Sequence, residues 1–403
     1  MAAVFNHVFA GNPLLPGKRE VRQTQEVAAL LANVGDAWFL PVSEGKPLVA
    51  ASQSAERVDW ELAWQTSDTA VRYLNTPQPV SSNAETFKNL PTTEDLVYVG
   101  ELQGRSHYAF NVPKHEGGKS ASSSGRSDER ALEKFAAPSG GYQTAYLDLR
   151  TLMMATTFGN AERKEDLAIV GYARALLGWH AINQYCGKCG TKTASVQFGL
   201  RRVCQQDSCR LKLYPRIDPV VIMCVVDKER DVILLGRGAR HPNNMYSCLA
   251  GFIEPGESLE EAVRRETREE VGIEIGDVVH HSSQPWPVGF GTQQCQLMVG
   301  FFAFAKTVEI NVDEAELADA RWFTRSEVRA AFSEEVYGSA QRDAQEKIAK
   351  ACFDRVEGGE AKIADLRGRT EPSALFVPGA YAIAHHLILA WLNKETGKLL
   401  SRV

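Results

Sequence analysis

Three glutamates at helical spacing are the residues of this sequence that most clearly point to chemistry. Glu266, Glu269 and Glu270 occupy positions i, i+3 and i+4, so in a helix all three carboxylates project from one face. Like charges at this spacing destabilise a helix unless a cation lies among them. Hard divalent cations take oxygen ligands, and Mg²⁺ binds a few carboxylates together with substrate phosphates. The spacing therefore predicts a Mg²⁺ or Mn²⁺ site that could hydrolyse a diphosphate.

The flanking residues predict the helix that must carry these glutamates, over residues 257–272. Ser258 and Glu261 form a capping box at its start, and Gly272 suits a left-handed end. The opposite face is largely apolar at four-residue spacing and should pack on a sheet; it consists of Leu259, Val263, Thr267 and Val271. The alternative is a solvated surface helix, against which the nearby Gly251 and the matched spacing argue.

Four cysteines predict a second metal site. Cys186 and Cys189 form one short-spaced pair, and Cys204 and Cys209 form another after fourteen intervening residues. Two such pairs on two turns can place four thiolates tetrahedrally around Zn²⁺, which leaves no open position for water. We therefore expect a zinc that holds structure and performs no chemistry. Two disulfides or four unrelated thiols are the alternatives.

The cysteine segment is also locally basic. Between Cys186 and Arg216 there are seven Lys and Arg residues against Asp207 alone. Ribbons with this balance can bind nucleic acid. A solvated basic face, or a patch that attracts substrate phosphates, is the other interpretation.

Apolar runs predict how strands and helices follow one another around these sites. Strands are expected at 219–227, 231–237 and 296–305, and helices at 164–184, 326–368 and 380–393, the last packing on the same sheet. Residues 1 to about 150 suggest a separate α+β domain without catalytic features. Within that domain, residues 116–130 are rich in Gly, Ser and charge and should form a mobile surface loop.

The whole chain is that of a folded protein with several domains. It has 403 residues, 44% of them hydrophobic, and a formal charge of −5, which excludes a globally basic surface. No stretch reaches the roughly 18 uninterrupted apolar residues of a membrane span, and no secretory signal is evident. We therefore expect an intracellular protein without a membrane partner. The terminal Ser401-Arg402-Val403 is similar to a peroxisomal address read by an import receptor, with a cytoplasmic location as the alternative.

Residues 251–273 resemble the Nudix box, Gly-x5-Glu-x7-Arg-Glu-aliphatic-x-Glu-Glu-x-Gly-aliphatic, with one departure at Thr267. Ser283-Gln284-Pro285-Trp286-Pro287 is similar to the signature of the NADH pyrophosphatase subfamily, although Val288-Gly289 replaces its usual aromatic-proline. That subfamily also carries a four-cysteine ribbon and a Tyr-Pro-Arg junction, here residues 214–216. The opening at residues 9–13, Phe-Ala-Gly-Asn-Pro, looks like that of plant-type peroxisomal members.

The resemblance implies roles for the carboxylates. Glu266, Glu269 and Glu270 would bind the catalytic ions, and Glu270 would also handle the attacking water. Glu316 matches a further metal carboxylate, although neighbouring Glu314 could be the true match. Structural support would come from Gly251, Glu257 and Arg265, the last two through an ion pair.

The same resemblance implies a substrate pocket. Phe252 would stack on a substrate base, Tyr214 would approach it from the same chain or from a partner subunit, and Gln284 and Trp286 would line the pocket. Packing in a core is the alternative for Tyr214 and Trp286. The implied assembly is a homodimer.

The predicted architecture is α+β, in three parts. They are an N-terminal α+β domain (1–160), a linker helix with a zinc ribbon (161–214), and a Nudix α/β/α sandwich with a mixed sheet and C-terminal helices (215–395). The predicted activity is hydrolysis of NADH or NADPH to reduced nicotinamide mononucleotide and AMP or its 2′-phosphate. Removal of NAD caps from RNA 5′ ends is one alternative. A zinc-ribbon binding module on a Nudix scaffold is another.

Overall fold

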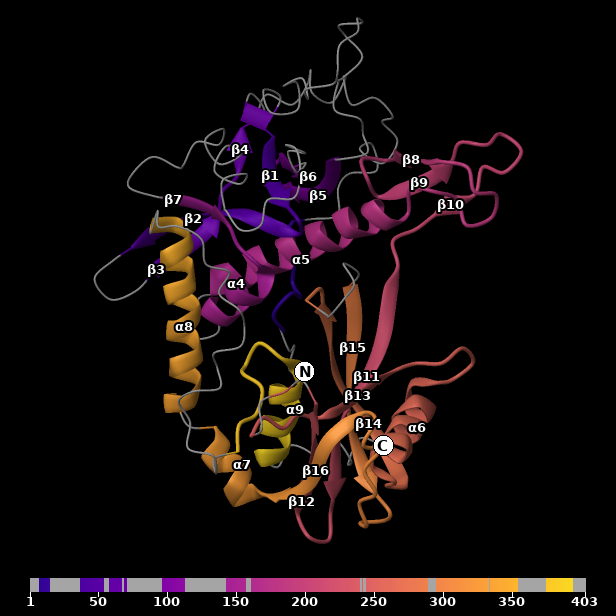
Figure 1. Cartoon of the computed structure of the whole chain (residues 1–403), viewed down its shortest axis with the longest axis vertical. Helices are drawn as coiled ribbons and strands as arrows, with labels where there is room; N and C mark the ends of the chain where they lie inside the picture. The colour runs from indigo at the N-terminus through magenta and orange to yellow at the C-terminus, as the bar shows by residue number, and fades with distance from the viewer. Residues whose placement is uncertain are drawn as a thin grey trace, which may run out of the picture.

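The computed structural model contains three β-sheets joined by helices (Figure 1). The residues that it describes are 7–14, 37–53, 58–66, 69–70, 96–112, 143–156, 161–239, 241, 244–288, 295–332, 334–353 and 375–393. The expected loop at 116–130 and the terminal tripeptide lie outside them. No helix within these ranges is both long and apolar enough to cross a membrane.

The N-terminal part is built on a seven-stranded sheet. Its strands are β1 (Trp38–Ser43), β2 (Lys46–Gln53), β3 (Val58–Leu62), β4 (Gln65–Thr66), β5 (Leu96–Leu102), β6 (Arg105–Asn111) and β7 (Gln143–Tyr146). The main order is β3-β2-β1-β6-β5, with β4 beside β1 and β7 beside β2. Glu44 and Gly45 link β1 to β2 with φ of 52° and 76°, a turn with two left-handed residues whose twist suits a hairpin.

Three helices cover this sheet, and one of them comes from the other end of the chain. They are α4 (Leu149–Thr156), α5 (Ala161–Ile182) and α8 (Glu334–Phe353). Ile348 of α8 shares one buried core with Leu152 of α4 and Val170 of α5. Because α8 packs on the N-terminal sheet, it crosses the expected division at residue 215. The domain limits therefore stay a prediction, and the two large parts are joined by more than a linker.

A small antiparallel ribbon follows α5. Its strands are β8 (Thr193–Val196), β9 (Arg201–Cys204) and β10 (Lys212–Leu213), in the order β10-β9-β8. The Arg202 side chain is fully buried at its base, where the guanidinium donates to the Thr193 hydroxyl at 2.7 Å and bonds the His180 ring at 2.8 Å. These contacts attach the ribbon to the end of α5. Figure 1 shows it projecting beside the body of the molecule.

The C-terminal part is a mixed six-stranded sheet. Its strands are β11 (Ile217–Asp227), β12 (Val232–Gly238), β13 (Leu249–Phe252), β14 (Ile275–Trp286), β15 (Cys295–Ala305) and β16 (Leu317–Thr324). The order is β14-β15-β11-β12-β16, with β13 beside β11. Only the β11–β15 pair of this sheet, within the described residues, is parallel.

Helices cover both faces of this second sheet. The helix α6 (Leu259–Val271) buries Val263 and Val271 against one face. The helices α7 (Arg325–Ala331) and α9 (Ile383–Leu392) cover the other face, where Leu387 and Trp391 are fully buried. The expected α/β/α sandwich with a mixed sheet is confirmed, and so is the packing of the last helix on it.

The local signals around α6 act as expected. Ser258 and Glu261 form both bonds of the capping box, and Gly272 ends the helix with φ of 72°. Thr267, the departure from the Nudix pattern, is fully buried, and its hydroxyl donates to the Val263 carbonyl at 2.7 Å. The substitution therefore introduces no unsatisfied polar group into the core.

Candidate metal centre and active site

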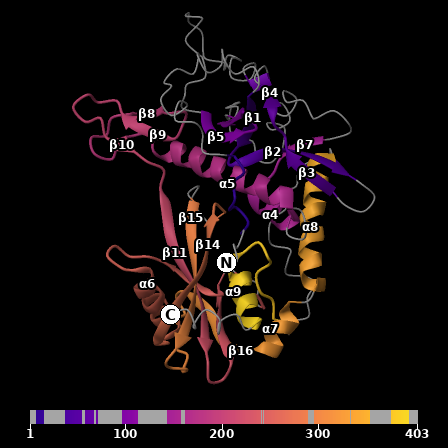
Figure 2. The same ribbon diagram turned by 180° about the vertical axis from the view of Figure 1, so that it is seen from behind.

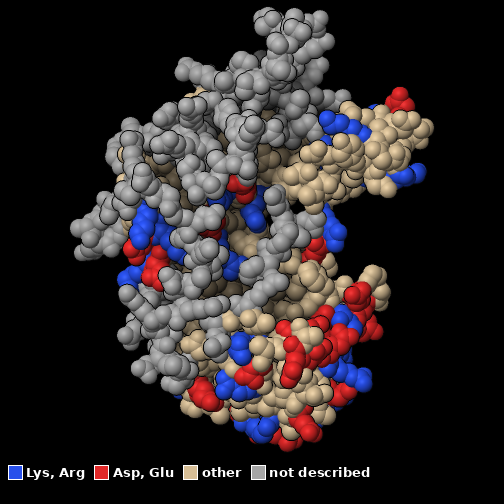
Figure 3. Space-filling view, in the orientation of Figure 1, with Lys and Arg blue, Asp and Glu red and all other residues tan. Residues whose placement is uncertain are grey.

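Three of the predicted carboxylates meet beside α6. Glu266 and Glu270 lie one turn apart on the helix, and Glu316 lies just before β16; one oxygen of each falls within 4.8 Å of the others. The loop that carries Glu316 is held to the end of α6, because the Asp313 N–H donates to the Glu270 carbonyl at 2.9 Å. Sequence reasoning did not single out Asp313, since backbone contacts leave no residue-type signal. Figure 3 shows acidic side chains gathered where Figure 1 places α6.

Glu270 has the most unusual surroundings of the three. Its side chain is buried, and its Oε2 has no hydrogen-bond partner among the described residues. Burial, followed by the charges of Glu266, Glu316 and Glu269, raises the pKa of Glu270 to about 8. An orphaned oxygen in a group of like charges is what a hard divalent cation would satisfy. The donor set therefore fits Mg²⁺ or Mn²⁺.

Gly251 leaves the space that Glu266 occupies. A Cβ built on Gly251 would lie 1.9 Å from the Cδ of Glu266, closer than any two such atoms can approach. The strand β13 therefore passes directly beneath this carboxylate. A glycine at this position is required by the carboxylate, and not by a special backbone angle.

Glu269 is not brought into the carboxylate cluster. Its side chain is half exposed, and its Oε2 accepts from Arg265 Nη1 at 2.9 Å. Arg265 also forms the expected ion pair with Glu257, at 2.5 and 2.8 Å, and donates to the Phe252 carbonyl at 2.9 Å. This arginine ties the loop before α6 to the helix. Glu314, the alternative to Glu316, is absent from the described cluster.

Two predicted substrate residues are open to solvent. Phe252 is 54% exposed at the end of β13, directly after Gly251. Tyr214 is 56% exposed at the junction of the ribbon and β11, with the Arg201 guanidinium 4.8 Å from its ring centre. Both rings are therefore available to a ligand or a partner, and neither is a core residue.

Gln284 and Trp286 are instead packed between parts of the molecule. The fully buried Gln284 amide donates to the carbonyls of Val8 at 3.0 Å and Tyr381 at 2.8 Å, and accepts from the Ile383 N–H at 2.8 Å. The Trp286 ring lies edge-on to Phe9, with centroids 6.0 Å apart. The geometry thus shows these side chains clamping residues 7–14 and the start of α9 onto β14. It shows no open surface on Gln284 for a substrate.

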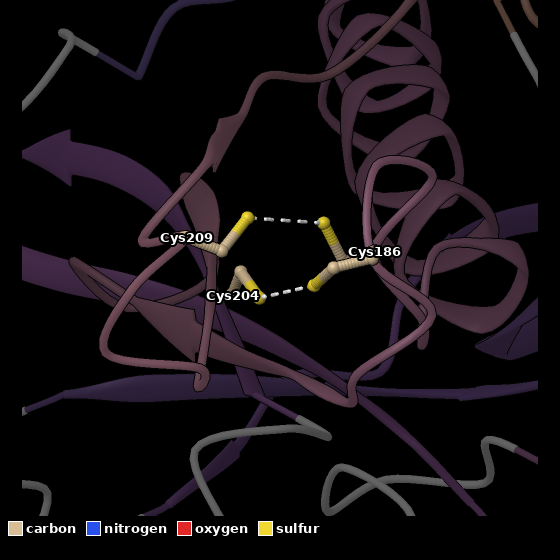
Figure 4. Close-up of side chains that lie close together, drawn as sticks. Cys186, Cys204 and Cys209 are labelled. Atoms are coloured by element: carbon tan, nitrogen blue, oxygen red, sulfur yellow. Dashed lines mark hydrogen bonds between the residues drawn. The ribbon is translucent and has the colours of Figure 1, made fainter.

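The four cysteines of the ribbon form a second cluster (Figure 4). Their sulfur atoms all lie within 4.8 Å of one another, at 3.9 Å for Cys186 to Cys209 and 3.4 Å for Cys189 to Cys204. A disulfide needs about 2 Å, whereas a tetrahedron with Zn–S bonds of about 2.3 Å has edges of about 3.8 Å. All four thiols are unpaired. The set fits a structural zinc, and the disulfide alternative does not match it.

Comparison with known proteins agrees with this geometry. Residues 216–342 match the sequence model of the NUDIX domain family. The chain is 42% identical to Nudix hydrolase 19, chloroplastic, of Arabidopsis thaliana, over 98% of this chain and 88% of that protein. The chain therefore belongs to the Nudix hydrolases, and the reading as a binding module on an inactive scaffold is not supported.

Two further relatives are similar over shorter shares of their length. The chain is 34% identical to the mitochondrial NAD(P)H pyrophosphatase NUDT13 of Mus musculus, over 75% of this chain and 73% of that protein. It is 36% identical to the NAD-capped RNA hydrolase NUDT12 of Homo sapiens, over 57% of this chain and 43% of that protein. The chain thus matches less than half of the human relative.

Proposed function

We propose that this enzyme hydrolyses the diphosphate bond of reduced nicotinamide dinucleotides, NADH or NADPH. The products are reduced nicotinamide mononucleotide and AMP, or the 2′-phosphate of AMP. The observation that carries the proposal is the cluster of Glu266, Glu270 and Glu316 around an orphaned carboxylate oxygen. The names of the pyrophosphatase and decapping relatives support the dinucleotide as substrate.

The chemistry requires positioning and charge neutralisation more than covalent catalysis. Glu266, Glu270 and Glu316 would hold Mg²⁺ or Mn²⁺, which when bound neutralises the diphosphate and activates it for attack by water. The oxygen of that water bonds to one phosphorus, and the bond from this phosphorus to the bridging oxygen breaks. Glu270 would accept the proton of the water. The bridging oxygen leaves with the other phosphate.

The other site residues would position the substrate and the metal-binding carboxylates. Arg265 holds Glu266 and the Phe252 carbonyl in place, so that loop and helix keep one arrangement. The exposed rings of Phe252 and Tyr214 offer faces on which a base can stack. We propose that Gln284 and Trp286 shape the pocket indirectly, through residues 7–14 and Tyr381. Glu269 would reach the ions only by releasing Arg265.

A comparison of kcat/KM for NADH, NADPH, NAD⁺ and NAD-capped RNA tests the proposal, with Mg²⁺ or Mn²⁺ present. We expect a preference of about tenfold for a free reduced dinucleotide, equal to about 1.4 kcal/mol of transition-state binding. The Glu270→Gln variant should lose this activity. Glu260→Gln, an exposed glutamate in the first turn of α6, is the matched control. Turnover of none of the four substrates would refute the dinucleotide assignment.

A second candidate activity is the removal of NAD caps from RNA, and the exposed surface of the ribbon favours it. Lys188, Lys192 and Lys212 are exposed there, and Tyr185, 65% exposed, pairs with Lys192 across a β-bridge. Figure 3 shows basic side chains on the projecting ribbon. Cations interleaved with an aromatic face suit a phosphate backbone with unstacked bases.

The two candidates differ in their dependence on salt. Replacing Lys188, Lys192 and Lys212 together by alanine should lower turnover of NAD-capped RNA and flatten its decline with salt. Turnover of NADH should not change, because these lysines lie on the ribbon and not at the carboxylates. Equal effects on both substrates would argue against a role of the ribbon in holding RNA.

We further propose that the enzyme works as a homodimer in which Tyr214 reaches the site of the partner. Exposed apolar side chains at the junction of ribbon and sheet support this proposal, namely Leu211, Tyr214 and Ile217. Light scattering on the purified protein should give the mass of two chains. A monomeric mass at micromolar concentration with full activity would refute it.

Peroxisomal import through Ser401-Arg402-Val403 is likewise a proposal. Two of the related proteins named above are described as chloroplastic and mitochondrial, and the name of the third gives no location, so these names do not support it. A fluorescent fusion that leaves the tripeptide free should collect in peroxisomes and become cytoplasmic when the tripeptide is deleted. An unchanged distribution after the deletion would exclude the signal.

A further inference from the structure

Two nitrogen-bearing side chains lie at the end of β12, the strand that pairs with β16 directly after Glu316. Gly238 pairs with Leu317 on β16, and Glu316 directly precedes Leu317. Neighbouring strands lie about 5 Å apart and residues about 3.3 Å apart along a strand, which puts the Cα of Arg237 within about 10 Å of that of Glu316. His241 lies close to the end of β12, because its backbone N–H donates to the Gly238 carbonyl at 2.9 Å.

Both side chains contain a buried nitrogen that nothing satisfies. Within the described ranges, neither Arg237 Nε nor His241 Nδ1 has a hydrogen-bond partner. Buried polar atoms are nearly always bonded, so a buried nitrogen without a partner calls for an explanation. Two such atoms on neighbouring residues indicate a group that binds there and accepts hydrogen bonds.

The nearest carboxylate is already engaged elsewhere. Asp319 lies opposite Arg237 in the register of β12 and β16. Its Oδ2 accepts from the Tyr246 hydroxyl and forms an ion pair with Arg321 at 3.1 Å. Arg237 thus forms no ion pair with any described residue.

A second arginine faces the same place from the N-terminal part. Arg150 is the second residue of α4, which Figures 1 and 2 both place at the boundary between the two large parts. Its Nη2 donates to the Val288 carbonyl at 3.2 Å. Burial, followed by the charges of Arg150 and Arg237, lowers the pKa of His241, so both arginines lie within electrostatic range of this histidine.

We propose that Arg237, with His241 and Arg150 beside it, binds a phosphate on the adenosine ribose of the substrate, namely the 2′-phosphate of NADPH. A phosphate monoester carries up to two charges and three acceptor oxygens, which suits an arginine fork and a neutral imidazole N–H. In this assignment the diphosphate lies on the carboxylates and the extra phosphate on the arginines. The inference rests on the proposed function, because it assigns a preference between two of its substrates.

Two other basic residues of this domain, Lys306 and Arg240, could also bind a phosphate. Lys306 is exposed after β15, where its side chain lies over Gly276 and its N–H donates to the Glu274 carbonyl. Arg240 lies outside the described residues. Lys306 therefore provides a matched control, because it is a cation of the same domain at the end of another strand, β15.

Calorimetric titration without divalent cations tests the subsite independently of turnover. The ligands are AMP, adenosine 2′,5′-bisphosphate and adenosine 3′,5′-bisphosphate. The wild-type protein should bind the 2′,5′-bisphosphate about tenfold more tightly than AMP, as one or two charged hydrogen bonds allow. Arg237→Met should reduce this ratio to below about twofold, while Lys306→Met keeps it. Thermal unfolding verifies that each variant is folded.

Three outcomes would overturn the assignment. Equal affinities of the wild-type protein for AMP and the 2′,5′-bisphosphate would show that no such subsite exists. Equal weakening of all three ligands by Arg237→Met would place this arginine on the 5′-phosphate. Preference for the 3′,5′-bisphosphate would identify the first phosphodiester of a capped RNA as the occupant. The titration measures binding and not turnover. Each of these results can therefore be interpreted even if the protein does not hydrolyse NADH or NADPH.

Discussion

The ability of each glutamate on α6 to bind a cation depends on the atoms that surround its carboxylate. Glu266 lies over Gly251, where no Cβ could fit, and Glu270 keeps a buried oxygen without a partner in the described part of the chain. Glu269 belongs to the same sequence pattern but is half exposed and bonded to Arg265. Identical residue types one turn apart thus have different surroundings. At this scale, the neighbours of each carboxylate decide which of them can hold a cation.

Replacing Gly251 by alanine should abolish most of the activity. The new Cβ would displace the Glu266 carboxylate by more than 1 Å, and a misplacement of this size can lower kcat by about a hundredfold. Gly276→Ala is the control, because its Cβ would meet the flexible end of Lys306 at 3.1 Å. Turnover of NADH by both variants checks the prediction, and an active Gly251→Ala protein would contradict the geometry.

The buried Glu270 should also make the Mg²⁺-free protein less stable as the pH rises. Its pKa is raised to about 8, so between about pH 4.5 and pH 8 the folded state holds a proton that the unfolded state has released. The free energy of unfolding should therefore fall by at most about 1.4 kcal/mol per pH unit across this window. Chemical denaturation at pH 5 and pH 8, with zinc retained, measures the fall.

Two comparisons isolate this effect of pH. Glu270→Gln should remove the dependence, because an amide does not titrate. Added Mg²⁺ should restore stability at pH 8, because it binds the ionised carboxylates. Stability that rises from pH 5 to pH 8 in the Mg²⁺-free protein, and does so equally in the variant, would show that Glu270 is not the responsible group.

At the scale of elements, each functional group lies on a unit with its own stabilising contacts. The helix α6 has a complete capping box and an apolar face on the sheet, so repulsion among its glutamates does not unfold it. The ribbon has few buried apolar side chains, and its short strands need another source of stability. We propose that a metal held by the four converging cysteines, zinc by the chemistry of the donors, provides it.

Elemental analysis should therefore find about one zinc per chain. Cys189→Ser should lose this zinc and expose the ribbon to protease, because the remaining three thiolates cannot close the site. Cys295→Ser, at a cysteine outside the cluster, should retain the zinc. Zinc content unaffected by Cys189→Ser would mean that the metal lies elsewhere.

At the scale of the whole molecule, the N-terminal and C-terminal parts form one body through contacts distant in sequence. Gln284 joins residue 8 to the start of α9, and Phe9 lies against Trp286. The helix α8 packs on the N-terminal sheet although it follows the Nudix strands. Residues 7–14 and the start of α9 therefore pack against β14 of the Nudix sheet.

Gln284→Ala should destabilise the protein by roughly 3 kcal/mol, because it leaves two carbonyls and one N–H unsatisfied in the interior. Denaturant unfolding measures this loss, and the KM for NADH reports any effect on the substrate. His280→Ala, an exposed position on the same strand, is the control. A large rise in KM with unchanged stability would instead show that Gln284 contacts the substrate.

Several features of the site could be read from the sequence because they are local. The spacing of Glu266 and Glu270, the capping box and Gly272 all act within a few helical turns, and the cysteine pairs lie on two short turns. Such patterns predict structure because the interacting groups are close along the chain. Three strands of the catalytic sheet, β11, β12 and β15, were predictable for the same reason, whereas β13, β14 and β16 were not predicted.

The remaining features depend on contacts between segments far apart in the sequence, and no local pattern encodes them. The choice of Glu316 over Glu269 follows from the loop that Asp313 holds against α6. The burial of Gln284 follows from a hydrogen bond to residue 8, across more than half the chain. The sequence by itself determined the chemistry of the donor groups. Only the tertiary structure decided which of them meet, because that depends on the packing of sheets and helices in space.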